Sequence, residues 1–356
     1  PLRCRREHAG ERAVFRRGGV LRLKPPTPKP HPHAASRLRF FTFRFSLFPY
    51  IMWLLLAFLS ASLLGFYDVF KKMALRGNAV IPVLFLNTLF CTLIFLPFII
   101  GSAVGWLGDS SMFYVETCGW NVHKFIILKS IIVLSSWVFG YFAMKHLPIT
   151  IVGPINATRP VMVLIGAMLV FGEQLNAWQW AGVLLAIISF FMLSRSGKKE
   201  GIDFKHDKWI YFLVLAAICG AISGLYDKFL MAPVANGGLG MSRMVVQSWY
   251  NIYQCAMMFT AMMLLWWPKR ANTTPLHWHW SIVFISVFLS AADFVYLYAL
   301  SMPAAMISIV SMVRRGSVIV SFLFGAAMFH EKNLKGKVVD LLLVLLGMIC
   351  LYIGSR

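Results

Sequence analysis

The sequence predicts an all-α membrane protein in which ten transmembrane helices form two inverted five-helix repeats. Three observations lead to this fold class. Apolar runs of about 18 residues or more, the length needed to span a bilayer, recur along the chain. Charged residues make up 13% of the sequence, well below the roughly 25% of soluble domains. Finally, the two halves of the chain carry the same polar residues at matched places.

The first 51 residues are predicted to be a disordered basic segment that does not belong to the mature protein. Residues 1–51 hold twelve of the 34 basic residues but two of the 13 acidic ones, and the stretch "KPPTPKPHPH" is too rich in proline for a helix. Met52 then opens the first apolar run. Three interpretations of the segment stay open: upstream sequence translated before a true start at Met52, an Arg-rich organellar transit peptide, and a functional basic tail.

The formal net charge of +21 does not indicate a nucleic-acid-binding protein. Outside residues 1–51, the basic side chains lie mostly in short segments between apolar runs. That distribution is typical of the cytoplasmic loops of membrane proteins and differs from a contiguous basic patch. We therefore expect the lipid bilayer as a partner and no nucleic acid, and we leave a homodimer open.

From Trp53 onward the apolar runs predict ten membrane spans separated by short polar loops. The spans are 53–73, 80–101, 124–145, 149–171, 177–194, 209–231, 244–267, 280–301, 304–329 and 337–354. The longest polar interruption, "RSGKKEGIDFKHDK", follows the fifth span. This linker, 195–208, divides the protein into a first repeat, 52–194, and a second repeat, 209–356.

The repeat is visible first in spans 1 and 6. The stretch "GFYDVFKKMA", which starts at Gly65, matches "GLYDKFLMAP", which starts at Gly224. The matched residues are Gly65/Gly224, Tyr67/Tyr226, Asp68/Asp227 and Phe70/Phe229. Chance similarity between apolar helices would not reproduce a tyrosine and an aspartate at the same places.

A second match links spans 3 and 4 with spans 8 and 9. Each half has a tyrosine, a proline and an arginine with six and ten residues between them. These residues are Tyr141, Pro148 and Arg159 in the first half and Tyr296, Pro303 and Arg314 in the second. Glu173 and Glu331 follow the next apolar run. Because five spans is an odd number, the second repeat must enter the membrane inverted, as in many secondary transporters.

With five plus five spans and an acidic residue closing the fourth span of each half, residues 53–354 resemble the drug/metabolite transporter superfamily, in its EamA-like branch. The resemblance implies an inverted-repeat bundle around a central cavity, used to export or exchange small metabolites. Its motifs identify neither the substrate nor a coupling ion.

The loop charges predict the orientation in the membrane. The odd-numbered loops carry fourteen Lys and Arg residues, whereas the even-numbered loops and the C-terminus carry three. The positive-inside rule then places the 195–208 linker in the cytoplasm and both ends of a protein starting at Met52 outside. Members of the resembling family more often keep their termini inside, and a genuine basic segment 1–51 would favour that arrangement. We expect a multi-pass protein of the cell (inner) membrane.

The residues expected to bind substrate lie at mid-membrane in spans 4 and 9. Arg159 lies about ten residues, or about 15 Å, into span 4, near the middle of a hydrocarbon core of about 30 Å. Arg314 lies at the same depth in span 9 and Arg315 follows it. An arginine at this depth must face a partner or a cavity. Since guanidinium groups favour carboxylate or phosphate, we expect a small anionic or zwitterionic metabolite as substrate.

An internal ion pair is the alternative role for these arginines. Asp293 of span 8 lies within reach of Arg314. The first half has Val138 at the position that matches Asp293, so Arg159 lacks an equivalent partner. Arg159 is therefore the stronger candidate for contact with substrate.

Span 4 contains "GPINATRP", in which two prolines remove backbone donors. Pro154 and Pro160 predict a kink or break that exposes backbone carbonyls, which is a common feature of transport sites. A simple packing kink is the alternative. The predicted site is completed by Asn156 and Thr158 of this stretch and by the motif tyrosines Tyr141 and Tyr296.

Three aspartates inside or near the ends of apolar spans are predicted to act in gating or proton coupling. Asp68 and Asp227 occupy matched positions, and Asp293 lies in span 8. The alternative for the matched pair is a structural ion pair, with Lys72 or Lys228 as the nearby cation. Their repetition assigns them to the architecture without showing contact with substrate.

No residue pattern indicates an enzyme, a cofactor or a metal site. "HWHW" at 277–280 is typical of an interfacial aromatic belt, "GAISG" at 220–224 of close helix packing, and the six cysteines of small packing residues. The sequence thus favours a secondary transporter of a small polar metabolite working by alternating access. The alternatives are a membrane-embedded enzyme acting on a lipid-linked precursor and a scaffold that does not transport.

Overall fold

The computed structural model describes the chain from Pro32 onward, with several gaps. The gaps are residues 163–164, 166–167, 169–174, 199–200, 232–233, 235–237, 302–309, 311–312, 330–333 and 355–356. Outside these gaps, side chains are described from Met52 onward, except those of residues 228, 297, 300 and 301. Glu173, Pro303 and Glu331, on which the predicted repeat partly rests, lie outside the described residues. The chain forms two compact units, Pro1–Ser46 and Leu47–Arg356, and all contacts below lie within the second.

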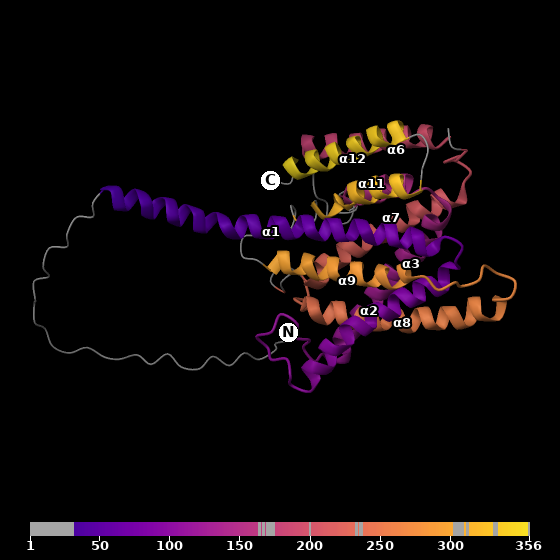
Figure 1. Cartoon of the computed structure of the whole chain (residues 1–356), viewed down its shortest axis with the longest axis horizontal. Coiled ribbons are helices and arrows are strands. Elements are labelled where there is room, and N and C mark those ends of the chain that lie inside the picture. The colour runs from indigo at the N-terminus through magenta and orange to yellow at the C-terminus, as the bar shows by residue number, and fades with distance from the viewer. Residues whose placement is uncertain are drawn as a thin grey trace, which may run out of the picture. The chain divides into compact units, whose positions relative to one another are not determined.

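The described residues form helices, turns and loops, and they include no strand. The α-helices, labelled in Figure 1, are α1 (Pro32–Leu75), α2 (Val80–Ala103), α3 (Trp120–His146), α4 (Ile149–Ala157), α6 (Ala177–Lys198), α7 (Lys208–Met231), α8 (Arg243–Ala261), α9 (Trp280–Ser301), α11 (Ser317–Phe329) and α12 (Leu334–Gly354). A π-helical turn, η2 (Met262–Trp266), and a 3₁₀ turn, η3 (Trp267–Lys269), follow α8. The all-α prediction is confirmed for the described part of the chain.

Six of the described helices are long and apolar enough to cross a membrane. Their spans are Met52–Leu75, Val80–Ala103, Trp120–His146, Ala177–Lys198, Lys208–Met231 and Leu334–Gly354, and a shorter apolar stretch covers Trp280–Tyr296. Helix α8 is less apolar because Gln247, Asn251 and Gln254 interrupt its hydrophobic residues. The protein is therefore an integral, multi-pass membrane protein.

Two predicted boundaries differ from the structure. Residues 32–51, predicted to be disordered, continue α1 toward the N-terminus. Pro32 is compatible with this start because a proline in the first helical turn lacks only an N–H that has no intrahelical partner. The linker predicted at 195–208 is shorter, since α6 ends at Lys198 and α7 begins at Lys208.

The proline-flanked segment of span 4 interrupts the helix. Helix α4 ends one residue before Thr158, which forms a turn, and helical structure resumes at Arg159. Pro160 then lies in the first turn of the new segment, where its missing N–H is tolerated. In the second half, a turn at Gly316 separates helical residues 313–315 from α11. The predicted break is confirmed, and a second one lies beside the other arginines.

Polar side chains connect neighbouring helices through backbone carbonyls. Thr92 of α2 donates to the carbonyl of Asn251 in α8 at 2.9 Å, and Ser286 of α9 donates to the carbonyl of Asn87 in α2 at 3.1 Å. Helix α2 thus packs against α8 and α9, while α3 packs against α7 and α8. In a medium without water these bonds satisfy each hydroxyl and fix the relative position of the helices.

Helices α6 and α12 pack side by side and antiparallel (Figure 1). A Cβ atom added at Gly182 would lie 2.8 Å from the Gly347 carbonyl oxygen, and one at Gly347 would lie 3.1 Å from the Gly182 oxygen. Two turns along, the Ser189 hydroxyl donates to the Asp340 carbonyl at 2.9 Å. Small residues let the two backbones approach this closely. Because α12 also packs against α4, the pair adjoins the interrupted helix.

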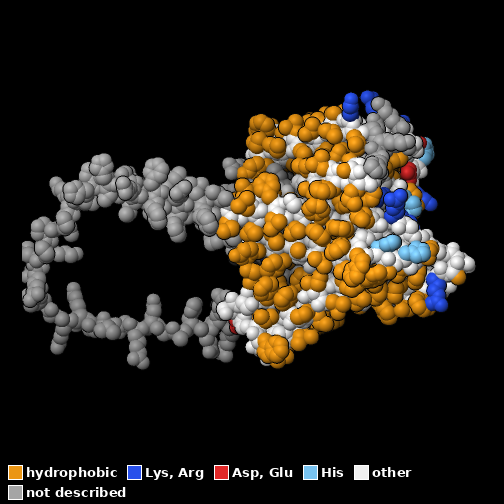
Figure 2. Space-filling view, viewed as in Figure 1, with side chains coloured by type: hydrophobic (Ala, Val, Ile, Leu, Met, Phe, Trp, Pro, Cys, Tyr) orange, Lys and Arg blue, Asp and Glu red, His pale blue; other side chains and the backbone are white. Residues whose placement is uncertain are grey.

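The outer surface of the second unit is strongly apolar. Large side chains on different helices are more than half exposed, among them Leu55 (60%), Leu184 (56%), Leu323 (61%) and Leu342 (59%). Figure 2 shows hydrophobic side chains over most of the visible face of this unit, with Lys, Arg and His side chains gathered at one end. A surface of this extent and composition requires a lipid environment.

The α6–α12 crossing should tolerate no added side chain. Gly182→Val should lower the thermal midpoint of the detergent-purified protein, because overpacking costs about 1–3 kcal/mol. Gly119→Val is the matched control, since a Cβ at Gly119 meets no atom within 4 Å. Equal midpoints for the two variants would contradict the close crossing.

Candidate functional site

Arg159 begins the helical segment after the break and reaches α7. A Cβ atom added at Gly220 of α7 would lie 2.8 Å from both Cζ and Nη1 of Arg159. Nη2 of Arg159 donates to the Ala216 carbonyl at 3.5 Å, and its Nε is buried without a hydrogen-bond partner among the described residues. Gly220, which the sequence suggested as a helix-packing residue, makes room for a buried guanidinium.

Arg314 forms the predicted ion pair with Asp293 of α9. Cζ of Arg314 also lies 4.3 Å from the ring centroid of Tyr296. Gln247 of α8 donates to the other carboxylate oxygen of Asp293 at 3.4 Å and to the Tyr250 hydroxyl at 3.1 Å. Both oxygens of Asp293 are therefore engaged. The ion pair is confirmed, whereas Gln247 and Tyr250 were not expected from the sequence.

Arg315 adds a second positive charge beside this pair. It lies within electrostatic range of Arg159 and Arg314, and Tyr296 is a further neighbour. No ion pair joins Arg315 to a carboxylate among the described residues. The interruptions of spans 4 and 9 thus bring Arg159 close to the adjacent pair Arg314 and Arg315, which lies far from it in sequence.

Asp227 of α7 pairs with a lysine that the sequence reasoning missed, Lys129 of α3. Nζ of Lys129 also lies 5.3 Å from the ring centroid of Tyr250. The side chain of Lys228, the partner considered from the sequence, lies outside the described side chains. Lys129 itself carried a signal, because an ionisable residue in the middle of an apolar span indicates a buried partner or a functional site.

Asp68 of α1 pairs with Lys71, three residues along the same helix, at 2.5 Å. Nζ of Lys71 lies 4.4 Å from the ring centroid of Tyr67 and 5.4 Å from that of Tyr141. Lys72, the partner considered from the sequence, donates instead to two backbone carbonyls at the end of α3. The two aspartates at matched positions are thus both paired, but with lysines from different places.

These eight side chains form what we call the charged cluster. Its members are Lys71, Lys129, Arg159, Arg314, Arg315, Asp68, Asp227 and Asp293. Asp68 acts electrostatically on Arg159, and Gln247 with Tyr250 bridges the pairs of Asp227 and Asp293. Every aspartate in it has a basic partner. Arg159 and Arg315 lack a carboxylate partner among the described residues, so the cluster has surplus positive charge.

The uncharged residues of the predicted site differ in what they offer a ligand. The Thr158 hydroxyl donates to the Ile155 carbonyl at 2.7 Å, so it is engaged within its own turn. Oδ1 of Asn156 and the hydroxyl of Tyr141 are buried without hydrogen-bond partners among the described residues. Tyr296 packs its ring against Arg314. Asn156 and Tyr141 therefore have polar atoms to spare, and Thr158 does not.

A buried row of amides on α2 and α8 was not predicted. Asn87, Asn251 and Gln254 are at most 2% exposed. Nδ2 of both asparagines and both polar side-chain atoms of Gln254 have no hydrogen-bond partner among the described residues. On α8 the row continues from Gln247 at helical spacing, because residues four and seven positions apart share a helix face. That spacing was the available sequence signal.

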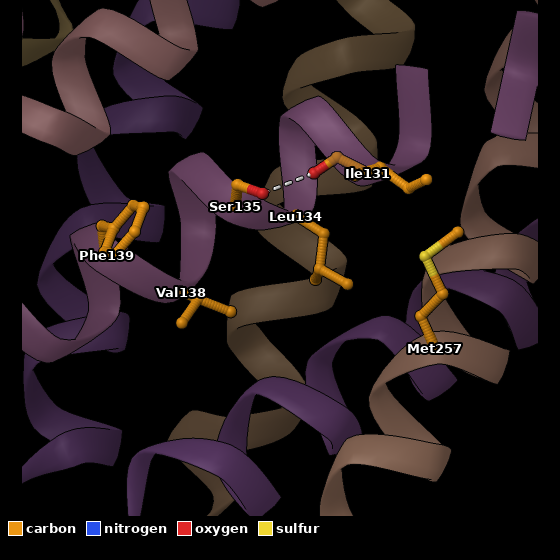
Figure 3. A pocket seen from close by; sticks show the side chains of 6 residues that line it. All are labelled: Ile131, Leu134, Ser135, Val138, Phe139 and Met257. Carbon is orange, nitrogen blue, oxygen red and sulfur yellow. Dashed lines mark hydrogen bonds between the residues drawn. The ribbon is translucent and has the colours of Figure 1, made fainter. Parts of the chain in front are cut away.

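The pocket in Figure 3 is separate from the charged cluster. It has a volume of about 230 Å³, lies between α3 and α8, and is lined by Ile131, Leu134, Ser135, Val138, Phe139 and Met257. The hydroxyl of Ser135 donates to the carbonyl of Ile131 at 2.8 Å and is thus satisfied within its helix. Val138, which occupies the position matching Asp293, lies in this apolar lining. The pocket offers no charged group for recognition.

The "HWHW" stretch lies just before α9 and at its start. Trp278 and Trp280 are 53% and 70% exposed, and their ring centroids lie 6.3 Å apart. In the part of the chain that the structure describes, no three His, Cys, Asp or Glu side chains are placed to hold a metal ion. Exposed tryptophans next to the start of an apolar helix are typical of a membrane interface.

Comparisons with known proteins give a family match and a similar solved structure. Residues 51–195 match the model of the EamA-like transporter family. One solved crystal structure, whose title gives no function, is similar over 83% of this chain and 99% of its own, with a TM-score of 0.53 and 16% sequence identity. At that identity the likeness concerns the fold alone. No curated protein matches the sequence.

The pair of Asp293 and Arg314 should behave as a unit. Asp293→Asn or Arg314→Gln alone should destabilise the protein by about 3–5 kcal/mol, because each leaves an uncompensated buried charge. The double variant should lose less than the sum of the two single losses. Thermal unfolding of the four proteins measures the coupling. Strict additivity would contradict a direct interaction.

Proposed function

We propose that the chain is a secondary transporter for a small anionic metabolite. Residues 51–195 match the model of the EamA-like transporter family, part of the drug/metabolite transporter superfamily, and this match supports the proposal. Members of this family are transporters and not enzymes. The charge of the substrate and the alternating-access mechanism are inferred from the charged cluster and from the helix contacts inside the bundle.

The surplus positive charge carries this proposal. Arg159 and Arg315 lie close together inside the bundle, and neither has a carboxylate partner among the described residues. A buried guanidinium without a counter-charge is costly in a membrane. An anionic substrate would supply that counter-charge, with two parallel hydrogen bonds from each guanidinium to a carboxylate or phosphate.

An anion fits the cluster better than a zwitterion. The ammonium group of a zwitterion would need an acidic acceptor beside the arginines. Asp68 is the aspartate that acts on Arg159, but it is already paired with Lys71 at 2.5 Å. The other two aspartates of the cluster are likewise paired. We therefore take a dicarboxylate or a phosphate monoester as the best-matched substrate class.

We further propose that the ten helices form inverted repeats that rock against each other. By position in the two repeats, α2 corresponds to α8 and α3 corresponds to α9. The packing of α2 against α9 then has an equivalent in the packing of α8 against α3, and the structure contains both contacts. The contact between α6 and α12 shows the same relation. If Gly182 of α6 corresponds to Asp340 of α12, and Ser189 to Gly347, then the Gly182–Gly347 contact is equivalent to the Ser189–Asp340 hydrogen bond. Reciprocal contacts of this kind support an internal pseudo-two-fold axis, the geometry used for alternating access.

The aspartates at matched positions are suited to act as gates in this scheme. Asp68 is held within α1 by Lys71, whereas Asp227 ties α7 to α3 through Lys129. One half thus has an ion pair between helices where the other has a pair within a helix. We propose that the Asp227–Lys129 link opens when access changes side, while Asp68 remains paired.

The alternatives make different demands on the charged cluster. An enzyme acting on lipid precursors needs acidic or histidine side chains that are clustered and free for proton transfer, but the aspartates of the charged cluster are paired. A scaffold has no need of surplus buried charge. Uptake of a labelled anion by reconstituted vesicles separates a transporter from both.

The role of Arg159 is tested by measuring binding, folding and transport on the same preparations. A panel of dicarboxylates and phosphate monoesters should raise the thermal midpoint of the wild type. Arg159→Gln should abolish this shift and reduce uptake about ten- to hundredfold, the effect of losing charge-assisted hydrogen bonds worth about 1.5–3 kcal/mol. Arg159→Lys should also transport poorly, because it keeps the charge but loses the planar pair of donors.

The control for this experiment is Arg270→Gln. Arg270 lies in an exposed turn, where its guanidinium packs over Trp267 at 4.1 Å. Its loss should leave both uptake and the anion-induced shift unchanged. Normal uptake per molecule by Arg159→Gln would refute the assignment.

We also propose that the segment between α6 and α7 is cytoplasmic and that the protein resides in the cell (inner) membrane. In a cysteine-free background, His206→Cys should resist an impermeant thiol reagent in intact cells, whereas Ser110→Cys in the α2–α3 loop should react. His206 is suitable because its side chain is 82% exposed, whereas Gly201 has a φ of 81° that disfavours cysteine. The opposite labelling pattern would reverse the orientation.

A further inference from the structure

Asp340 differs from the other carboxylates in the described membrane-spanning helices. It lies in α12, is 0% exposed, and neither of its carboxylate oxygens has a hydrogen-bond partner among the described residues. Asp68, Asp227 and Asp293 are each paired with a basic side chain. Gating or proton coupling was predicted from the sequence for those three aspartates and not for Asp340.

Among the residues that the structure describes, no charged group on the helices packed around Asp340 pairs with its carboxylate. On α6, Ser189 meets only the backbone carbonyl of Asp340, and the charged residues, Arg195 and Lys198, lie about 9 Å or more further along the helix axis. Helices α4 and α11 contain no titratable residue. On α12, Lys337 is also fully buried, engages other groups and forms no ion pair with Asp340.

A carboxyl group that is buried without a partner is most stable in its neutral, protonated form. An isolated charge in an apolar interior is so costly that the group takes up a proton and becomes neutral instead. Protonating Asp68, Asp227 or Asp293 would in contrast leave a buried Lys or Arg without its partner. Of these four aspartates, Asp340 is therefore the one that can bind and release a proton without breaking an ion pair.

The surroundings of Asp340 connect it to the candidate site. The next residue, Leu341, packs with Ala157 of α4 and with Val318 and Phe322 of α11. Ala157 is the last residue of α4 before the interruption that precedes Arg159. A movement of α12 that admits water between α12 and α4 would hydrate Asp340 and at the same time release the end of α4.

We propose that Asp340 is a proton-binding site whose occupancy is coupled to the opening of the bundle. In the closed arrangement the carboxyl group holds a proton. When α12 separates from α6 and α4, water reaches the group, the proton leaves to solvent and the carboxylate is hydrated. Rebinding of a proton permits repacking. The proton site itself is independent of the proposed function. Its coupling to transport rests on that function and adds that a proton moves together with the anion.

The proton site is tested without any substrate by infrared spectroscopy. Wild-type protein in lipid nanodiscs at neutral pH should show the carbonyl stretch of a protonated carboxylic acid, and raising the pH should remove it. Asp340→Asn should lack this band, while Asp109→Asn, which changes a carboxylate in the exposed α2–α3 loop, should retain it. The pH titration of the wild type serves as a second readout that needs no variant to fold.

Two spectroscopic results would overturn the proposal. A wild-type spectrum without the band would mean that Asp340 is charged and neutralised by Lys337 or another group. A band that persists in Asp340→Asn would assign the proton to another residue. Asp340→Asn should fold, because a neutral amide replaces a neutral acid of the same shape, and its thermal midpoint at neutral pH should match that of the wild type.

The coupling is tested in proteoliposomes with labelled succinate as the probe. An inwardly directed proton gradient should accelerate wild-type uptake several-fold. Asp340→Asn should lose this acceleration yet still exchange succinate across the membrane at the wild-type rate. Acceleration that survives in Asp340→Asn would refute the coupling. If wild-type protein carried neither succinate nor a phosphate monoester, the proposed function would fail, and the infrared result would still decide the proton site.

Discussion

Lipid cannot neutralise a charge or satisfy a hydrogen bond, so an ionised group inside the membrane needs a partner in the protein or in a bound ligand. Helix packing in this bundle follows from that requirement. Asp227 reaches a lysine because α7 lies against α3, and Asp293 reaches Arg314 because α9 adjoins the interrupted ninth span. Gln247 then joins the two pairs through Tyr250. Ionic groups that would each be unfavourable alone thus become part of one connected interior.

Small residues and helix interruptions make room for these groups. The guanidinium of Arg159 occupies the space that a side chain at Gly220 would fill. At Gly65 of α1, an added Cβ would lie 2.5 Å from Cβ of Val320 in α11, so this helix pair also depends on the absence of a side chain. The turns at Thr158 and Gly316 place arginines at helix ends. Backbone groups next to a helix end lack intrahelical partners, so they remain available for hydrogen bonding.

Sequence reasoning succeeded where the signal was local or repeated. Apolar length predicted the helices, two prolines predicted the break before Arg159, and matched depth predicted the Asp293–Arg314 pair. It failed where the answer depended on which helices become neighbours. Lys129 is 98 residues from Asp227, and only the packing of α3 on α7 brings them together. The amides of α8 recur at helical spacing in the sequence. They were overlooked because a mean hydropathy over an apolar run does not reveal the few polar residues within it. The helical residues 32–51 were missed because their charge and prolines suggested disorder.

The antiparallel contact between α6 and α12 has a consequence for biosynthesis. Ser189 and Asp340 are separated by 151 residues, so α6 is complete long before its partner leaves the ribosome. At about 5–20 residues per second, the delay is on the order of ten to thirty seconds. During that interval the seam around Gly182 faces lipid or another helix, and the first five spans exist without the surface that finally covers them. The packing of this seam is therefore one of the last steps in the assembly of the bundle, because it waits for the final helix.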